Sequence, residues 1–430
     1  MIQKFANGLY LLAIFLLPWQ TQVILSVGTV SGEPSAYAVL GITVVEVMLL
    51  CVYLLRMHRP KEMETRRIGR ALYLFLAATF FSLSASRFSS VGWFHMVHVV
   101  SAAIFFFLLI DERTKLKPVL VAFLLGLLVP ISLGWFQVLT GASPDSTLLG
   151  IAAKDAQTLG VSVVETVSGR MLRAYGTFPH PNIFGGYLAV GVVALAWLTR
   201  FVKKKWELAF MLIGSALLGL TLIVTFSRSA WLGITIGLIV LIALMVRDRK
   251  MPSRQALPII GLGVICLLAT IAIFHTEVFA RFNPTLRLEA VSIEERTSQY
   301  QTFGDVFLSS PILGVGPNAY TFTLADQDPG QPVWSYQPIH NVFLLILGEL
   351  GLVGFSLFLF WIGRIGHISL MSMQTPDGMF AVTLGVSLFV IAVFDHYLWT
   401  LWPGLALSAF ALALIVRWSK SEARLPYYGS

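Results

Sequence analysis

Long apolar runs are the feature that most restricts what this chain can fold into. At least ten stretches of about 20 predominantly apolar residues recur along the sequence, and about 20 such residues are what an α-helix needs to cross a bilayer core of about 30 Å. A membrane β-barrel is excluded because it would show alternating segments of about 10 residues. The sequence therefore predicts an all-α integral membrane protein.

The runs predict about twelve transmembrane helices, with two larger loops at residues 139–181 and 276–340. This divides the chain into N-terminal helices (1–138), a first large loop (139–181), a second group of helices (182–275), a second large loop (276–340), and C-terminal helices with a tail (341–430). The predicted spans are 5–25, 36–55, 69–86, 92–110, 117–138, 182–200, 206–226, 229–246, 256–275, 341–363, 379–394 and 398–417.

Basic residues set the predicted orientation. The net charge of +8 does not indicate nucleic-acid binding, because the positive charges form short clusters between apolar runs, as in cytoplasmic loops. With both termini inside, cytoplasmic segments hold 22 of the 30 Lys and Arg residues. Only Lys4 precedes the first apolar run, which we interpret as a retained helix rather than a signal peptide. Cys51 and Cys266 lie in apolar runs and indicate neither a disulfide nor a metal site.

The remaining positive charges fall in outer loops, where orientation requires none, and seven of the eight are arginine. The guanidinium group offers a planar fork of donors that suits phosphate oxygens. We therefore expect an anionic partner at the outer surface, with a diphosphate as the natural candidate. The eight residues are Arg87, Lys154, Arg170, Arg173, Arg228, Arg281, Arg287 and Arg296.

Two of these arginines have a local context that suggests a site. Arg228 lies between two apolar runs, where a charge is costly and usually faces a cavity or a partner; Ser227 and Ser229 add hydroxyl donors. Its side chain could instead reach the outer headgroups. Arg296 lies in a predicted amphipathic helix with Val291, Phe303 and Phe307 near one face, where it could simply pair with a neighbouring glutamate.

Two similar segments, FPHPNIF (178–184) and QPIHNVF (337–343), place Pro, His and Asn where an outer loop becomes a helix. Helix N-termini have free N–H groups and a partial positive charge, so two such ends would form an anion-binding floor if they met. His340 or His180 could accept a proton from a hydroxyl, and residue chemistry alone does not rank them. Asn341 is a capping residue.

Other polar features carry less information. Glu46 and Glu349 are intramembrane carboxylates that could belong to a proton pathway, which would favour a transporter. The Asp326-Gln327-Asp328 segment is a weak metal-binding pattern that arises easily by chance. The PILGVG segment (311–316) lacks the context of a dinucleotide fingerprint, and we interpret it as a backbone turn.

The sequence resembles the bacterial O-antigen ligase superfamily, which also contains O-antigen polymerases and protein O-oligosaccharyltransferases. The resemblance runs from about Arg173 to Gly354. The segments that carry it are RAYGTFPHPNIFGGYLA, TFSRSAWLG, ERTSQYQ with SSPILGVGPNAY, and HNVFLLILGELGLVG, in the order of the family.

The resemblance implies a twelve-helix, GT-C-like inverting glycosyltransferase that takes a glycan from undecaprenyl diphosphate, with no cofactor and no metal. The family's motif arginines fall on Arg228 and Arg296, and its motif histidine on His340. Arg228 and Arg296 would stabilise charge on the diphosphate, and His340 would be the base. Arg173 lies in a block that commonly carries arginine. With His180, Asn182, Ser227 and Asn341, Arg173 makes up the expected substrate-binding set.

These features predict a multi-pass protein of the bacterial inner (plasma) membrane with a periplasmic active site. The expected acceptor is lipid A-core, giving lipopolysaccharide. A second lipid-linked repeat unit would make the protein a polymerase, and a protein acceptor is a third possibility. A transporter of lipid-linked saccharide is the alternative from another class; it predicts inverted repeats around a midplane site, and the two halves show no convincing repeat.

Overall fold

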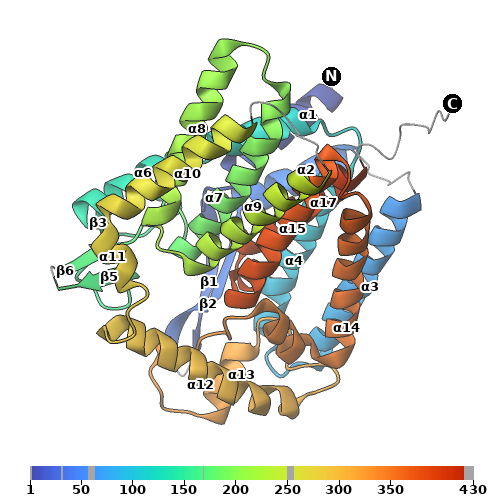
Figure 1. Cartoon of the computed structure of the whole chain (residues 1–430). Coiled ribbons are helices and arrows are strands. Elements are labelled where there is room, and N and C mark those ends of the chain that lie inside the picture. Colours follow the sequence, from blue (N-terminus) through green and yellow to red (C-terminus); the bar gives the residue numbers. More distant parts are fainter. Residues whose placement is uncertain (1, 31, 57–62, 168, 249–255, 421–430) are drawn as a thin grey trace.

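The computed structural model describes residues 2–30, 32–56, 63–167, 169–248 and 256–420, and helices dominate it (Figure 1). The first helices are α1 (Ile2–Leu16), α2 (Val44–Arg56), α3 (Met63–Ala85), α4 (Ser89–Ile110), α5 (Leu116–Gly126), α6 (Leu128–Thr140), α7 (Pro181–Leu198) and α8 (Lys205–Val224). They are followed by α9 (Arg228–Asp248), α10 (Ala256–Ile273), α11 (His275–Ala280), α12 (Arg287–Ser309), α13 (Tyr320–Gln327), α14 (Val342–Met371), α15 (Pro376–Phe394), α16 (Tyr397–Thr400) and α17 (Trp402–Lys420).

The predicted class, an all-α membrane protein, is confirmed. Within the described ranges nine helices are long and apolar enough to cross a membrane, and α5 and α6 together form one of them. Three of the twelve predicted spans are shorter than expected: α1 has 15 residues, α2 has 13 and α10 has 18, of which 258–273 form the short apolar part. Several basic residues of the predicted cytoplasmic segments lie outside the described residues: Arg59, Lys61, Arg249, Lys250, Arg254 and Arg424.

A β-hairpin replaces helix between the first two spans, which corrects the prediction for residues 17–25 and 36–43. Strands β1 (Gln22–Val30) and β2 (Glu33–Thr43) pair antiparallel, from Gln22 opposite Thr43 to Val30 opposite Glu33. β1 is rich in valine, isoleucine and threonine, whose branched side chains favour strands. Two short strand pairs lie in the described part of the first large loop: β3 (Ala142–Ser143) with β4 (Lys154–Asp155), and β5 (Val163–Thr166) with β6 (Gly169–Leu172).

The deepest helices are α7 and α17, whose membrane-length segments are 89% buried inside the protein. Around them, α15 packs against α9 and α17, α17 packs against α4, and α14 packs against α3. Because α7 begins at residue 181 and α17 follows the 395–401 turn, the residues just before both central helices lie at the same end of the bundle, where the polar residues described below gather.

Helix α14 is interrupted at Gly351, which has φ 61° and ψ −171°. The 311–316 segment lies against this break, and its N–H groups donate to the carbonyl oxygens of Gly348 and Glu349 at 3.1 and 2.8 Å. Gly314 has φ +75°, and a Cβ there would lie 2.2 Å from the Glu349 carbonyl oxygen, so the close approach requires glycine. The predicted backbone turn is confirmed, and it supplies hydrogen bonds that the broken helix lacks.

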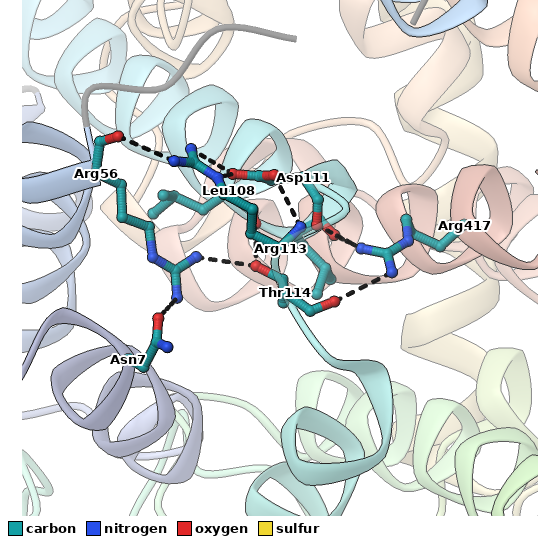
Figure 2. A network of polar contacts seen from close by, with 8 residues as sticks. Asn7, Arg56, Leu108, Asp111, Arg113, Thr114 and Arg417 are labelled. Atoms are coloured by element: carbon teal, nitrogen blue, oxygen red, sulfur yellow. Dashed lines mark hydrogen bonds and ion pairs between the residues drawn. The ribbon is translucent and has the colours of Figure 1, made fainter. Parts of the chain in front are cut away.

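At the other end of the bundle, arginines tie helix ends together (Figure 2). Arg56 donates to the side chains of Asn7 and Thr114 at 2.8 and 2.9 Å. Arg417 donates to three backbone oxygens at and just beyond the end of α4, at 2.6 to 3.1 Å. Cations are favourable at helix C-termini, where carbonyl groups lack partners. Segments predicted to be cytoplasmic thus meet at one end and predicted outer loops at the other.

Candidate active site

Residues that lie far apart in the sequence meet at the end of the bundle that we predicted to be periplasmic. α7 begins after His180, α9 begins at Arg228, α14 begins after Asn341, and the turn between α15 and α16 carries Asp395 and His396. Hydrogen bonds and ring contacts connect these elements to α12. The site is therefore assembled from the ends of helices that pack in the core of the bundle.

His340 is held in one tautomer by Gln299 on α12. The Gln299 side-chain oxygen accepts hydrogen bonds from the His340 backbone N–H at 3.2 Å and from its ring Nδ1–H at 2.9 Å. With the proton on Nδ1, Nε2 keeps a lone pair. Burial, and then the charge of His396, lower the pKa of His340 to about 3, so the ring is neutral at pH 7. Such an imidazole can accept a proton from a hydroxyl.

Asp395 and His396 complete this cluster, and the sequence analysis missed both. The His396 and His340 rings stand edge to face, with centroids 4.9 Å apart and planes at 82°. A ring nitrogen from each histidine and a carboxylate oxygen of Asp395 all lie within 4.8 Å of one another. Burial alone would raise the pKa of Asp395, but the neighbouring histidines and the His396 N–H lower it below its usual range. An ionised carboxylate thus faces two imidazoles.

The sequence did contain a signal for this turn. The segment FDHYLW (394–399) inserts an aspartate and a histidine between two apolar runs at the predicted outer face. A buried carboxylate or histidine at such a position usually has a partner or a function. Short spacing hides the signal, because only three residues separate the two predicted spans.

Asp395 is linked to the first large loop through Asn182. The Asn182 side-chain amide donates to Asp395 Oδ2 at 2.7 Å, and its oxygen accepts from Arg173 Nη2 at 2.6 Å. Arg173 also donates through Nε to the Thr225 carbonyl at 2.9 Å. Burial, followed by the charges of other arginines, lowers the pKa of Arg173 to about 9, so it remains a cation at neutral pH. Arg173 and Asn182 therefore fix the carboxylate rather than stand free.

Three further arginines approach the cluster from α9, α11 and α12. Arg228 donates to Glu289 Oε2 at 3.0 Å and to the Arg281 carbonyl oxygen at 2.9 Å, and Arg281 also pairs with Glu289. Arg296 has no hydrogen-bonded or ion-paired partner among the described residues, although its charge acts on the pKa of His340. One carboxylate is thus shared by two arginines, and the third cation is unpaired.

The other outer arginines lie in surface contacts. Arg287 pairs with Glu165 at 2.9 Å, Arg170 donates to the Gln157 carbonyl at 3.1 Å, and Arg87 lies 3.6 Å from Asp326. These three arginines therefore have partners of their own, and none of them was among the predicted site residues. The predicted helix around Arg296 is confirmed, but its inner face differs from the predicted one: Glu289, Gln299 and Val306 are buried, whereas Val291 is 42% exposed.

The remaining predicted binding residues mainly form hydrogen bonds with backbone N–H groups and with other side chains of the protein. His180 accepts the Asn182 N–H through Nδ1 at 3.2 Å and lies 3.1 Å from Ser162 Oγ through Nε2. Asn341 caps α14 by accepting two N–H groups at 3.0 and 3.1 Å. Ser227 is fully buried, with Oγ 3.3 Å from Ser229 Oγ. Asp395 connects the two similar helix starts, because its carboxylate accepts from Asn182 at 2.7 Å and lies within 4.8 Å of a ring nitrogen of His340.

His340, Asp395 and His396 are also a donor set that a divalent cation such as Zn²⁺ or Mn²⁺ could use. The Asp326/Asp328 pattern is not such a set. Asp326 lies near Arg87, and Asp328 accepts from Gln331 Nε2 at 3.3 Å. Among the described residues the site offers one possible metal position, and it coincides with the proton acceptor.

Two cavities adjoin the cluster. The first, of about 360 Å³, is lined almost entirely by apolar side chains of α3, α4, α14, α15 and α17, and it begins at Val342 and Trp399. The second, of about 350 Å³, has mixed walls and lies between the β-hairpin and the outer ends of α4 and α17. Both are within the size range of small-molecule sites.

The fold and this site define a multi-pass helical membrane protein with a cluster of arginines and histidines at one end of the helix bundle. Residues 213–359, about a third of the chain, match the family model described as O-Antigen ligase. The matched segment contains Arg228, Arg296 and His340, and it supports the similarity to the O-antigen ligase superfamily. Arg173 and the 178–184 segment lie outside it. No curated protein matches the chain. The family supports a membrane glycosyltransferase activity of the ligase or polymerase type.

Proposed function

We propose that this protein transfers a glycan from undecaprenyl diphosphate to an acceptor hydroxyl at the periplasmic face of the inner membrane, with lipid A-core as the acceptor. The observation that carries the proposal is the excess of positive charge beside a neutral histidine. Arg228 and Arg281 share one carboxylate, Glu289. Arg296, whose charge acts on His340, has no hydrogen-bonded or ion-paired partner among the described residues. A diphosphate would supply the missing negative charge, and arginine forks suit its oxygens.

In the proposed reaction, the acceptor oxygen forms a bond to the anomeric carbon while the bond from that carbon to the diphosphate oxygen breaks. The electron pair leaves with the diphosphate, whose developing charge Arg228 and Arg296 stabilise. His340 Nε2 takes the hydroxyl proton, and Asp395 stabilises the resulting imidazolium. Direct displacement inverts the anomeric carbon. Diphosphate is a good leaving group, so no second carboxylate is needed as an acid.

A reconstituted assay tests the function. Purified protein receives a glycan on undecaprenyl diphosphate, with lipid A-core in one reaction and only further lipid-linked repeat in another. Product on lipid A-core supports the ligase, whereas a ladder that grows without it makes the protein a polymerase. Transfer to neither acceptor, with lipid-linked glycan crossing a proteoliposome membrane, would replace both with a transporter.

The structure weakens the argument for a proton-coupled transporter. Glu349 accepts from Trp399 Nε1 at 2.6 Å and from the Tyr320 N–H at 3.4 Å. Glu46 accepts from the Thr43 N–H at 2.9 Å and lies 2.6 Å from His98 Nδ1. Both carboxylates are engaged in local structure, which gives each a stabilising role without proton transfer.

The apolar cavity is the proposed position of the polyprenyl chain. It begins beside the His340 and Asp395 segments, and Leu370 and Phe389, which also line it, are 57% and 59% exposed, so it opens to the lipid side. Moving the chain from lipid into this cavity gains little hydrophobic free energy, because both surroundings are apolar. The cavity would therefore act by positioning the donor.

We expect Gly366→Phe to raise the KM for a donor with a C55 polyprenyl chain about ten-fold, which corresponds to about 1.4 kcal/mol. The KM for a donor with a C15 chain should not change. Gly366 lines the cavity, and a Cβ there meets nothing within 4 Å. Gly363 in the same helix has the same open space but does not line the cavity, so Gly363→Phe is the matched control. Equal effects on both donors would reject this position for the chain.

Treatment with EDTA should leave transfer unchanged. In the proposed mechanism His340 Nε2 must accept a proton, which it cannot do while it binds a cation. Transfer is measured before and after dialysis against the chelator, with metal analysis of the purified protein. Loss of activity that Zn²⁺ or Mn²⁺ restores would instead assign His340, Asp395 and His396 as metal ligands.

A further inference from the structure

The mixed cavity reaches the histidine pair through Thr400, which contacts His396, and no arginine lines it. Its walls come from β1 and β2, the first three turns of α4, and the 400–403 segment, together with Pro179 and Asn318. The hairpin that the sequence analysis did not predict is thus one wall of a cavity next to the reactive cluster. None of the residues with proposed catalytic roles lines it.

The cavity joins the cluster through His396. Thr400, which lines the cavity, has its hydroxyl 2.9 Å from His396 Nδ1. Tyr37, another wall residue, has its ring centroid 6.0 Å from that of His396. Since His340 contacts both Gln299 of α12 and His396, a series of contacts connects α12, which carries Arg296, through His340 and His396 to the cavity.

The walls combine hydrogen-bonding groups with aromatic rings. Gln22 and Ser90 contribute an amide and a hydroxyl, and Phe94 and Trp402 contribute rings. Polar groups for hydroxyls and rings for the faces of a pyranose are what a sugar requires; a lipid chain would leave the amides unpaired at a cost. This composition contrasts with the almost wholly apolar first cavity.

One wall residue has a hydrogen-bonding atom without a partner. His95 is 2% exposed, its ring stands edge to face against Trp399 at 4.9 Å, and its Nε2 has no hydrogen-bonding partner among the described residues. A buried polar atom of this kind costs free energy unless something pairs with it. A ligand hydroxyl in the cavity would satisfy it.

We propose that this cavity is the acceptor subsite and binds the sugar unit that carries the attacking hydroxyl. This inference rests on the proposed glycosyl transfer. Direct displacement requires the nucleophile and the leaving group to be on opposite sides of the anomeric carbon. The cavity meets the histidine pair at His396 and contains none of the arginines proposed to hold the diphosphate, so acceptor and leaving group would have separate sites. The hydroxyl would enter past His396 and reach His340, while the diphosphate stays with Arg228 and Arg296.

Tryptophan substitutions that narrow the cavity test this. Ser26 and Ser90 both line it and are exposed, so Ser26→Trp and Ser90→Trp fill space without removing a packed side chain. Val27 is 49% exposed in the same strand and does not line the cavity, which makes Val27→Trp the matched control. We expect the two serine variants to raise the acceptor KM at least about ten-fold, with donor KM and slow donor hydrolysis unchanged.

An increase in donor KM instead, or no change in either KM, would overturn the acceptor subsite while leaving glycosyl transfer intact. Wild-type protein that transfers glycan to no acceptor would refute the proposed function itself. A second measurement does not depend on variants. Lipid A-core carrying a photoreactive group should label the β1–β2 hairpin or the start of α4, and excess unlabelled lipid A-core should prevent the labelling. Labelling confined to α9–α12 would contradict the subsite.

Discussion

Replacing His340 with alanine should lower the rate of transfer about 10²- to 10⁴-fold, the usual contribution of a positioned general base. The side chain makes one ring hydrogen bond, to Gln299, and it contacts the His396 ring, so the bundle should still form. Transfer is measured with saturating donor and acceptor, and thermal unfolding is measured on the same preparation. The loss should appear in kcat, because His340 acts on the transferred proton.

The pH profile provides a separate check on this assignment. Since burial lowers the pKa of His340 to about 3, the ring is already neutral well below its ordinary pKa of about 6.5. Transfer should therefore not decline as the pH falls from about 8 to about 6. Near-normal activity of His340→Ala would transfer the role to another group, and His396 is then the first to test because its ring faces the same space.

Asp395→Asn provides a comparison. It removes the charge but keeps one side-chain oxygen, which can take over one of the two hydrogen bonds that Asp395 accepts, from Asn182 at Oδ2 or from the His396 N–H at Oδ1. If Asp395 stabilises the imidazolium form of His340, kcat should fall in this variant. The decline in rate on the acid side of the pH profile should then occur at a lower pH, and the unfolding temperature should change little. An effect on stability alone would make Asp395 an anchor for the ends of α7 and α15.

Composition was sufficient for the class of fold, but hydropathy alone did not distinguish the hairpin from helix. Residues 22–30 have the same apolar character as a membrane span. Their β-branched side chains favour a strand, and the positive φ of Gly32 allows a turn. A hydropathy average over 20 residues does not record these local backbone preferences. The same averaging explains why α1 and α2 are shorter than their predicted spans.

Site residues could be predicted where a local sequence pattern marks their position. They could not be predicted where the packing of distant helices brings them to the site. Arg228 and His340 stand at helix starts, which capping residues and apolar boundaries mark in the sequence. Asp395 joins them only because α15 packs against α9 and α7, and no sequence spacing relates it to Asn182, 213 residues away. Glu289, which two arginines share, was considered only as a partner within its own helix.

Changing Arg228 to lysine should lower kcat about 10²- to 10³-fold, comparable to the loss of one donor to a developing oxyanion. Nη1 of Arg228 already donates to the Arg281 carbonyl and to Glu289, which fixes the guanidinium plane. A lysine keeps the charge but has a single nitrogen, so it cannot hold both protein partners and bind a phosphate oxygen in a fork. Glu289 would still pair with Arg281, so the fold should persist.

Arg287→Lys is the matched control. Arg287 is the first residue of α12, as Arg228 is of α9, but it is 63% exposed and pairs with Glu165. Its kcat should stay near wild type. If Arg228→Lys has full activity, the arginine supplies only a positive field and the fork geometry is irrelevant. A rise in donor KM with kcat unchanged would mean that Arg228 binds the diphosphate equally in the ground and transition states, and stabilisation of the leaving group would then fall to Arg296, the one cation of the cluster without a partner among the described residues.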